Sequence, residues 1–121
     1  MRQVLKDYYT GFEGHPEITF VRRRPDGDLV FTLWDGYFND IMMAIKPDSK
    51  GWTSLALVYH LDEGWYDDPD WLIPDPSSAL AQLRGIDASK LSDEPRKILG
   101  ELLAFLDEGL AAGDEIRIQY S

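Results

Sequence analysis

The sequence contains no cysteine. This absence excludes a disulfide framework, a thiol nucleophile and any metal site with cysteine ligands. Long apolar runs are also missing, because charged residues interrupt the first dozen positions and no later stretch approaches the length of a membrane span. We therefore expect neither a signal peptide nor a membrane segment, and we expect a cytoplasmic protein.

Positive charge is scarce in this chain. Twelve lysine and arginine residues stand against 22 aspartate and glutamate residues, giving a formal net charge of -10 and an isoelectric point near 4.4. Such a charge repels nucleic acid backbones and anionic lipids and attracts basic proteins. We expect a basic protein partner, no direct contact with nucleic acid and no membrane binding. Acidity also keeps a small protein soluble, which is the simpler explanation of the charge.

Lysine and arginine are absent between Gly51 and Gln82. Within this gap carboxylates are interleaved with large aromatic side chains, in the sequence HLDEGWYDDPDW from residue 60 to residue 71. Carboxylates steer a basic surface toward the protein, and rigid rings supply buried contact area. The predicted partner-binding residues are the acids Asp62, Glu63, Asp67, Asp68 and Asp70 and the aromatic anchors Trp65, Tyr66 and Trp71.

We call residues 60–76 the acidic tract. Prolines at positions 69, 74 and 76 disfavour a regular helix or a central strand through most of it. The sequence therefore predicts a long loop that follows a strand, and loops of this length in compact domains are often functional. Whether the tryptophans of the tract contact a partner or pack on the protein's own sheet is open at this point.

Hydrophobic periodicity predicts the remaining elements. Apolar residues at helical spacing predict a short helix over residues 2–12. Alternation and turn sequences predict strands over 17–24, 28–34, 37–45, 52–61 and 115–120. Two further helices are expected, one capped by Ser77 or Ser78 and ended by Gly85, and one from Ser92 to Gly113. The apolar stripe of the second is expected to comprise Ile98, Leu99, Leu102, Leu103, Phe105, Leu106 and Leu110.

These elements predict one α+β domain over residues 1–121. Its mostly antiparallel sheet has about five strands, and the N-terminal helix and the two helices of the C-terminal half pack chiefly on one face.

No catalytic signature accompanies these elements. The carboxylates of the acidic tract are suitable oxygen ligands for Mg²⁺ or Ca²⁺, but their spacing does not match the calcium-binding loop. The sequence contains no G-x-S-x-G motif and no glycine-rich phosphate loop. We therefore predict no catalytic residues, no metal ligands, no cofactor and no enzymatic activity. A small metal-dependent hydrolase that uses the same carboxylates and a structural or homo-oligomeric module are the alternatives.

Arg22, Arg23 and Arg24 form the only run of basic residues. In an extended strand the first and third share a face. We expect these arginines to form ion pairs within the protein, with Glu17, Asp26 or Asp28 on neighbouring strands.

In general build the chain resembles the small acidic α+β immunity proteins of bacterial contact-dependent inhibition and polymorphic toxin systems. The resemblance depends on the acidic residues from Asp62 to Asp75 and on the strand-rich frame around them. It implies a protein that neutralises a toxin by binding and masking a basic domain, such as a nuclease domain. In that case the carboxylates take the place of substrate phosphates on the partner's surface.

Overall fold

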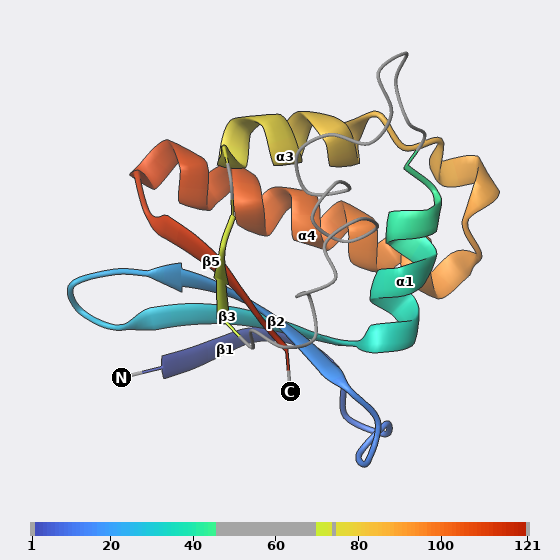
Figure 1. Cartoon of the computed structure of the whole chain (residues 1–121), viewed down its shortest axis with the longest axis horizontal. Coiled ribbons are helices and arrows are strands. Elements are labelled where there is room, and N and C mark those ends of the chain that lie inside the picture. Colours follow the sequence, from blue (N-terminus) through green and yellow to red (C-terminus); the bar gives the residue numbers. More distant parts are fainter. Residues whose placement is uncertain (1, 46–69, 74, 121) are drawn as a thin grey trace.

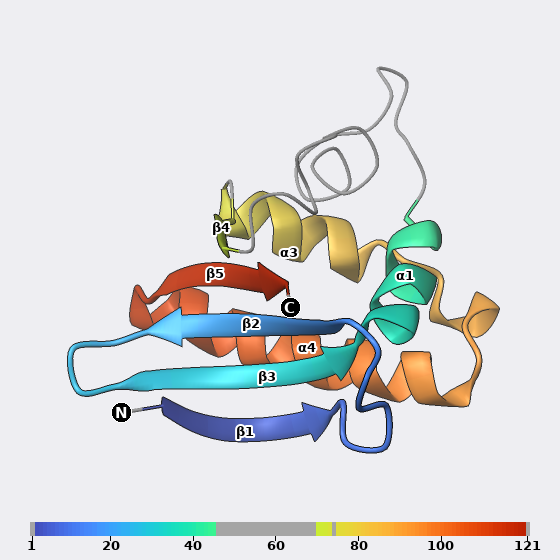
Figure 2. The same cartoon turned by 60° about the horizontal axis from the view of Figure 1, so that its bottom comes forward.

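A computed structural model describes residues 2–45, 70–73 and 75–120. It has an α+β fold in which the helices lie on one side of a mixed sheet (Figures 1 and 2). The strands are β1 (Arg2–Tyr8), β2 (Glu17–Arg23), β3 (Asp28–Trp34), β4 (Asp70–Leu72) and β5 (Glu115–Tyr120). The helices are α1 (Asp35–Met43), α3 (Pro76–Arg84) and α4 (Asp93–Ala112), with a short 3₁₀ turn, η1 (Ala88–Lys90), before α4.

The five strands follow the order β1-β3-β2-β5-β4 across the sheet. The predicted strands over 17–24 and 28–34 are confirmed as β2 and β3, which form a hairpin. Its turn ends at Gly27 with a φ of 131°, a conformation that favours glycine. β5 pairs antiparallel with β2, and β4 pairs antiparallel with β5. β1 runs parallel to β3, so the sheet is mixed.

The core lies between the sheet and the helices. Alternate residues of the central strands are buried against the helices, as period-two alternation requires. These residues are Ile18, Phe20, Phe31, Leu33, Ile116 and Ile118. α4 buries Ile98, Leu99, Leu102, Phe105 and Leu106 against them, which confirms most of the predicted stripe. Leu110, in the last turn of α4, is instead 38% exposed.

The predicted N-terminal helix is wrong, because residues 2–8 form the edge strand β1. The apolar side chains that suggested a helix are not packed as a stripe, since Val4 and Leu5 are 54% and 39% exposed. A helix this short is marginal in water unless its apolar face is buried. Backbone pairing with β3 stabilises the strand instead, with a bulge between Val4 and Lys6.

The predicted strand over residues 37–45 is also wrong, because residues 35–43 form helix α1. Phe38, Ile41, Met42 and Ile45 are buried in the core, and they follow the i, i+3, i+4, i+7 spacing of one helix face. Asp35 and Gly36, which lie between the predicted strands over 28–34 and 37–45, form the first turn of this helix. The predicted strand over residues 52–61 lies outside the described residues.

The two later helices are confirmed. α3 begins at Pro76, and its N-cap is Asp75, whose carboxylate accepts a hydrogen bond from the backbone N–H of Ser78. The predicted serine caps of α3 are therefore wrong by a few residues, because an aspartate before a proline suits the cap better. α4 begins after Ser92 and ends at Gly113, which has a φ of 75°.

Candidate functional site

Most of the predicted partner-binding residues lie outside the described residues. These are Asp62, Glu63, Trp65, Tyr66, Asp67 and Asp68. Asp70 and Trp71 begin β4, where the backbone of Asp70 pairs with Gln119 and that of Trp71 pairs with Ile118. The acidic tract was predicted to be a loop, and for residues 70–72 this is wrong, because an edge strand tolerates the neighbouring prolines that a central strand does not.

The register shows at which end of the sheet β4 begins. One row of paired residues crosses all five strands, namely Asp7, Thr32, Thr19, Gln119 and Asp70. This row lies next to the positions where β2 begins and where β3 and β5 end. The described end of the acidic tract is therefore joined to the sheet at the end where β3 leads into α1.

A cluster of aromatic side chains occupies the same end of the sheet. We call Phe12, His15, Trp34 and Tyr37 the aromatic corner. The rings of Phe12 and Trp34 are stacked, with centroids 4.3 Å apart and planes 5° apart. Tyr37 meets both rings edge-on, at 5.4 Å from Phe12 and 5.1 Å from Trp34. The His15 ring lies edge-on to Trp34 at 6.1 Å. Three of the rings are half-buried and His15 is exposed.

The loop between β1 and β2 lies at the end of the sheet where β3 leads into α1 (Figure 2). It contains two members of the corner, Phe12 and His15. The Tyr9 hydroxyl donates a hydrogen bond to the backbone carbonyl of His15 at 2.6 Å. The backbone N–H of Asp35 donates to the carbonyl of Pro16 at 3.1 Å, which ties the loop to the start of α1. Gly14, with a φ of 94°, supplies the backbone conformation that the turn needs.

Asp7 holds the start of this loop. Its carboxylate accepts hydrogen bonds from the Thr10 hydroxyl at 2.5 Å, the Tyr9 N–H at 2.8 Å and the Thr10 N–H at 3.0 Å. It also accepts from the Thr32 hydroxyl at 3.2 Å. Because these bonds favour the charged form, the Thr10 hydroxyl first among them, the pKa of Asp7 lies below its ordinary value of 3.8.

Trp34 folds back over the first turn of α1. A Cβ atom at Gly36 would lie 2.5 Å from the Trp34 ring, so only glycine allows this approach. Beside it, the Oδ1 atom of Asp35 is buried and has no hydrogen-bond partner among the described residues. Desolvation disfavours the ionised form of this carboxyl and raises the pKa of Asp35 above 3.8. The residue that follows Trp34 therefore carries a carboxylate whose ionisation is disfavoured in the folded protein.

An open pocket of about 400 Å³ adjoins the corner at His15. It is lined by Tyr9, Gly14, His15, Pro16, Glu17 and Tyr120. No lysine or arginine occurs between Lys6 and Arg22, or between Arg24 and Lys46. The segments that build the corner thus share the chemistry of the acidic tract, with carboxylates and aromatic rings and no basic residue.

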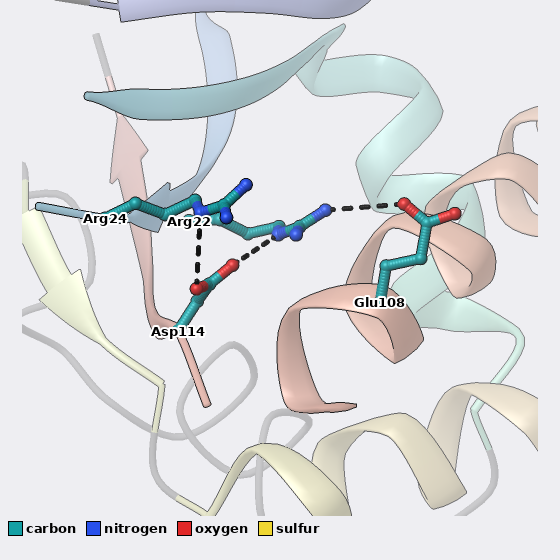
Figure 3. A network of polar contacts seen from close by, with 4 residues as sticks. All are labelled: Arg22, Arg24, Glu108 and Asp114. Atoms are coloured by element: carbon teal, nitrogen blue, oxygen red, sulfur yellow. Dashed lines mark hydrogen bonds and ion pairs between the residues drawn. The ribbon is translucent and has the colours of Figure 1, made fainter. Parts of the chain in front are cut away.

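The basic run of β2 has a structural role. The Arg22 Nε donates to Oδ2 of Asp114 at 2.9 Å, Arg24 lies 3.8 Å from the other oxygen of Asp114, and Arg22 lies 3.5 Å from Glu108 (Figure 3). The guanidinium of Arg22 also lies over the Phe105 ring at 5.3 Å. These ion pairs differ from the predicted ones because β2 pairs with β5 and faces α4, which a pattern local to the hairpin does not reveal.

Within residues 2–45, 70–73 and 75–120, no group of three or more His, Asp or Glu side chains is arranged to hold a metal ion. In the same part of the chain no helix combines the length and the hydropathy of a membrane span.

Comparison of the chain with protein-family models, with curated proteins and with solved structures found no match.

The aromatic corner was not predicted from the sequence. Two signals were present: the segments without lysine or arginine on either side of the hairpin, and the aromatic residues within them. Trp34 and Tyr37 were assigned to strand packing, and Phe12 to a helix, so the three rings were not predicted to meet. Their contact depends on β1 being a strand and on α1 following β3 directly, and both of these elements were misassigned.

Proposed function

We propose that this chain is an immunity-type protein, acting in the cytoplasm, that binds a basic toxin domain and masks it with the acidic tract. The net charge of -10 favours a basic partner and disfavours nucleic acid. The absence of lysine and arginine from residues 52 to 81 concentrates the negative charge in the region of the tract. The contact residues are those named above, from Asp62 to Trp71.

The observation that carries the proposal is the attachment of the described end of the tract to the sheet. Residues 70–72 pair with β5, and they enter the sheet at the end that carries the aromatic corner. A segment anchored in a sheet loses less conformational entropy on binding than a free acidic tail does. Carboxylates in such a segment raise the association rate and oppose the phosphate-binding groups of a nuclease, while the aromatic residues slow dissociation.

The experiment uses the C-terminal domain of a large secreted protein encoded directly upstream of this chain. That domain is expressed in bacteria with and without this protein, and growth is followed. We expect the domain to arrest growth and this protein to restore it. The proposal is wrong if no such domain is encoded there, or if co-expression leaves the growth arrest unchanged.

Charge reversal then tests the tract itself. We expect Asp67→Lys with Asp68→Lys to abolish protection and to lower the association rate at low salt by at least about tenfold. The matched control is Asp26→Lys with Asp40→Lys, which changes the net charge by the same amount at exposed positions of the hairpin turn and of α1. Equal losses from the two pairs would mean that only net charge matters, and the tract would not be the contact surface.

A metal-dependent hydrolase is separated from this function by titration. Mg²⁺, Mn²⁺ and Ca²⁺ are added while the melting temperature is measured. A metal site with a dissociation constant one hundredfold below the metal concentration stabilises the folded state by about 2.7 kcal/mol. We expect the metals to give no stabilisation of that size, and therefore no matching rise in the melting temperature. The homo-oligomeric alternative is tested by measuring the mass of the protein in solution. If the protein forms an oligomer, we expect that disrupting the oligomer leaves protection unchanged.

A further inference from the structure

The aromatic corner is not explained by packing alone. Phe12, His15 and Trp34 are outside the hydrophobic core cluster, and Tyr37 only borders it. Their rings nonetheless meet with well-defined geometry, with two of them stacked at 4.3 Å. Surface clusters of tryptophan, tyrosine and phenylalanine are typical of the energetic centres of protein interfaces, where rigid rings bury large areas at low entropic cost.

We propose that the aromatic corner binds an arginine side chain of a basic protein partner. The inference rests on the proposed function for the nature of the partner, and it adds a second contact surface at the end of the sheet where the acidic tract is attached.

Charge complementarity identifies the occupant. The segments 7–21 and 25–45 contain acidic residues and no lysine or arginine. Asp35, which follows Trp34 in the sequence, has a partly buried carboxyl group, and its Oδ1 atom has no hydrogen-bond partner among the described residues. Glu17 brings a second carboxylate to the wall of the adjoining pocket. A surface built from these segments attracts a cationic side chain and repels an anionic one.

The aromatic faces favour arginine over lysine. A planar guanidinium stacks on aromatic rings and donates hydrogen bonds to a carboxylate in the same plane, whereas an ammonium group is compact and strongly hydrated. The pocket of about 400 Å³ beside His15 has room for such a side chain. The loop bonds of Tyr9 and Pro16 hold the rings in place before binding, which lowers the entropic cost of association.

The first test compares two peptides of equal charge, nona-arginine and nona-lysine. Each is added to the isotopically labelled protein while amide signals and the Trp34 indole signal are followed by NMR. We expect the arginine peptide to shift signals of residues 9–17 and 34–37 in a saturable manner, with at least about threefold higher affinity than the lysine peptide. Equal affinities, or shifts that avoid these residues, would overturn the proposal.

The second test removes ring surface. Phe12→Ala combined with His15→Ala is expected to weaken binding of the arginine peptide about tenfold. Met43→Ala is the control, because Met43 is a 63% exposed apolar side chain on α1 that belongs to neither the corner nor the adjoining pocket. Circular dichroism and melting temperature establish that both variants are folded. If a double variant that is folded by these measures binds the arginine peptide as the parent does, the corner is not the site.

The same double variant distinguishes this inference from the proposed function. If it still protects cells from the upstream toxin domain and binds that domain with unchanged affinity, the corner makes no contact and the inference fails, while the immunity function stands. If the parent protein gives no protection, the immunity function fails whatever the peptides do. Protection by the parent together with at least about tenfold weaker toxin binding by the variant supports both.

Discussion

Arg22 of β2 and Asp114, just after α4, form a buried ion pair. Their side chains are 5% and 7% exposed, and the Arg22 Nε donates to Oδ2 of Asp114 at 2.9 Å. The pair joins the end of α4 to the second strand of the sheet, across a long stretch of sequence. Because both charges are removed from water, each depends on the other for compensation.

Breaking this pair is expected to be costly. Asp114→Ala leaves the Arg22 guanidinium buried without its main partner, and we expect a loss of about 3 kcal/mol in the free energy of unfolding. The control is Asp107→Ala, which removes an exposed ion pair to Arg84 at 3.1 Å and should cost less than about 1 kcal/mol. Urea denaturation measures both. Similar losses from the two variants would contradict a structural role of the buried pair.

Alanine substitutions at two glycines of α4 are expected to change the stability of the protein in opposite directions. A Cβ at Gly109 would lie 3.0 Å from Cδ and Nε of Arg22, a side chain already held by Asp114, so Gly109→Ala should destabilise the protein by about 1–3 kcal/mol. A Cβ at Gly100 meets nothing within 4 Å. Gly100→Ala should therefore stabilise the helix by about 0.5–1 kcal/mol. Thermal unfolding of the two variants shows whether each substitution raises or lowers the stability.

Residues 35–43 offer a test of helix against strand. In α1, Ile41 is fully buried and Met43 is 63% exposed, whereas in a strand the two side chains would share a face. We expect Ile41→Ala to lower the free energy of unfolding by about 2–5 kcal/mol and Met43→Ala to change it by less than about 0.5 kcal/mol. Comparable effects at the two positions would contradict the helix.

Asp7 is expected to make stability depend on pH. Its pKa is lowered in the folded protein, so its stabilising contribution is present above the ordinary value of 3.8 and is lost as the pH falls through the folded value. Asp7→Asn should cost about 0.5–1 kcal/mol at pH 7, a small amount because the carboxylate is largely solvated. The difference from the parent should shrink as the pH falls below 3.8 and through the folded value. Asp40→Asn, which removes an exposed carboxylate of α1, controls for net charge.

Asp35 is expected to behave in the opposite sense. Desolvation raises its pKa, so the folded state is favoured while the carboxyl is protonated and loses that advantage as the pH rises through the folded value. Asp35→Asn should therefore leave the melting temperature at pH 7 unchanged or raise it. The difference should disappear below pH 3.8, where the carboxyl is protonated in both states. A lower melting temperature at pH 7 would show that the charge stabilises the fold.

The hairpin and the long helix were predictable because their signals are local. The turn at Pro25-Asp26-Gly27 specifies a tight connection, and the stripe of α4 repeats over several helical turns. The errors fall where short segments satisfy two patterns. Residues 2–8 and 35–43 are each short enough for helical and extended spacing to fit, so their tertiary partners decide between them.

The sequence alone determined the acidity of this protein, its α+β class and the concentration of carboxylates and aromatic rings in the acidic tract, because these follow from composition and local periodicity. Tertiary structure decided what those residues contact. Residues 2–8 form a strand because β1 pairs with β3, although their apolar spacing predicts a helix. Pairing of β4 with β5 brings the described end of the tract to one end of the sheet. Strand register and helix packing are interactions between distant segments, and they bring Phe12, Trp34 and Tyr37 into one cluster that local patterns do not reveal.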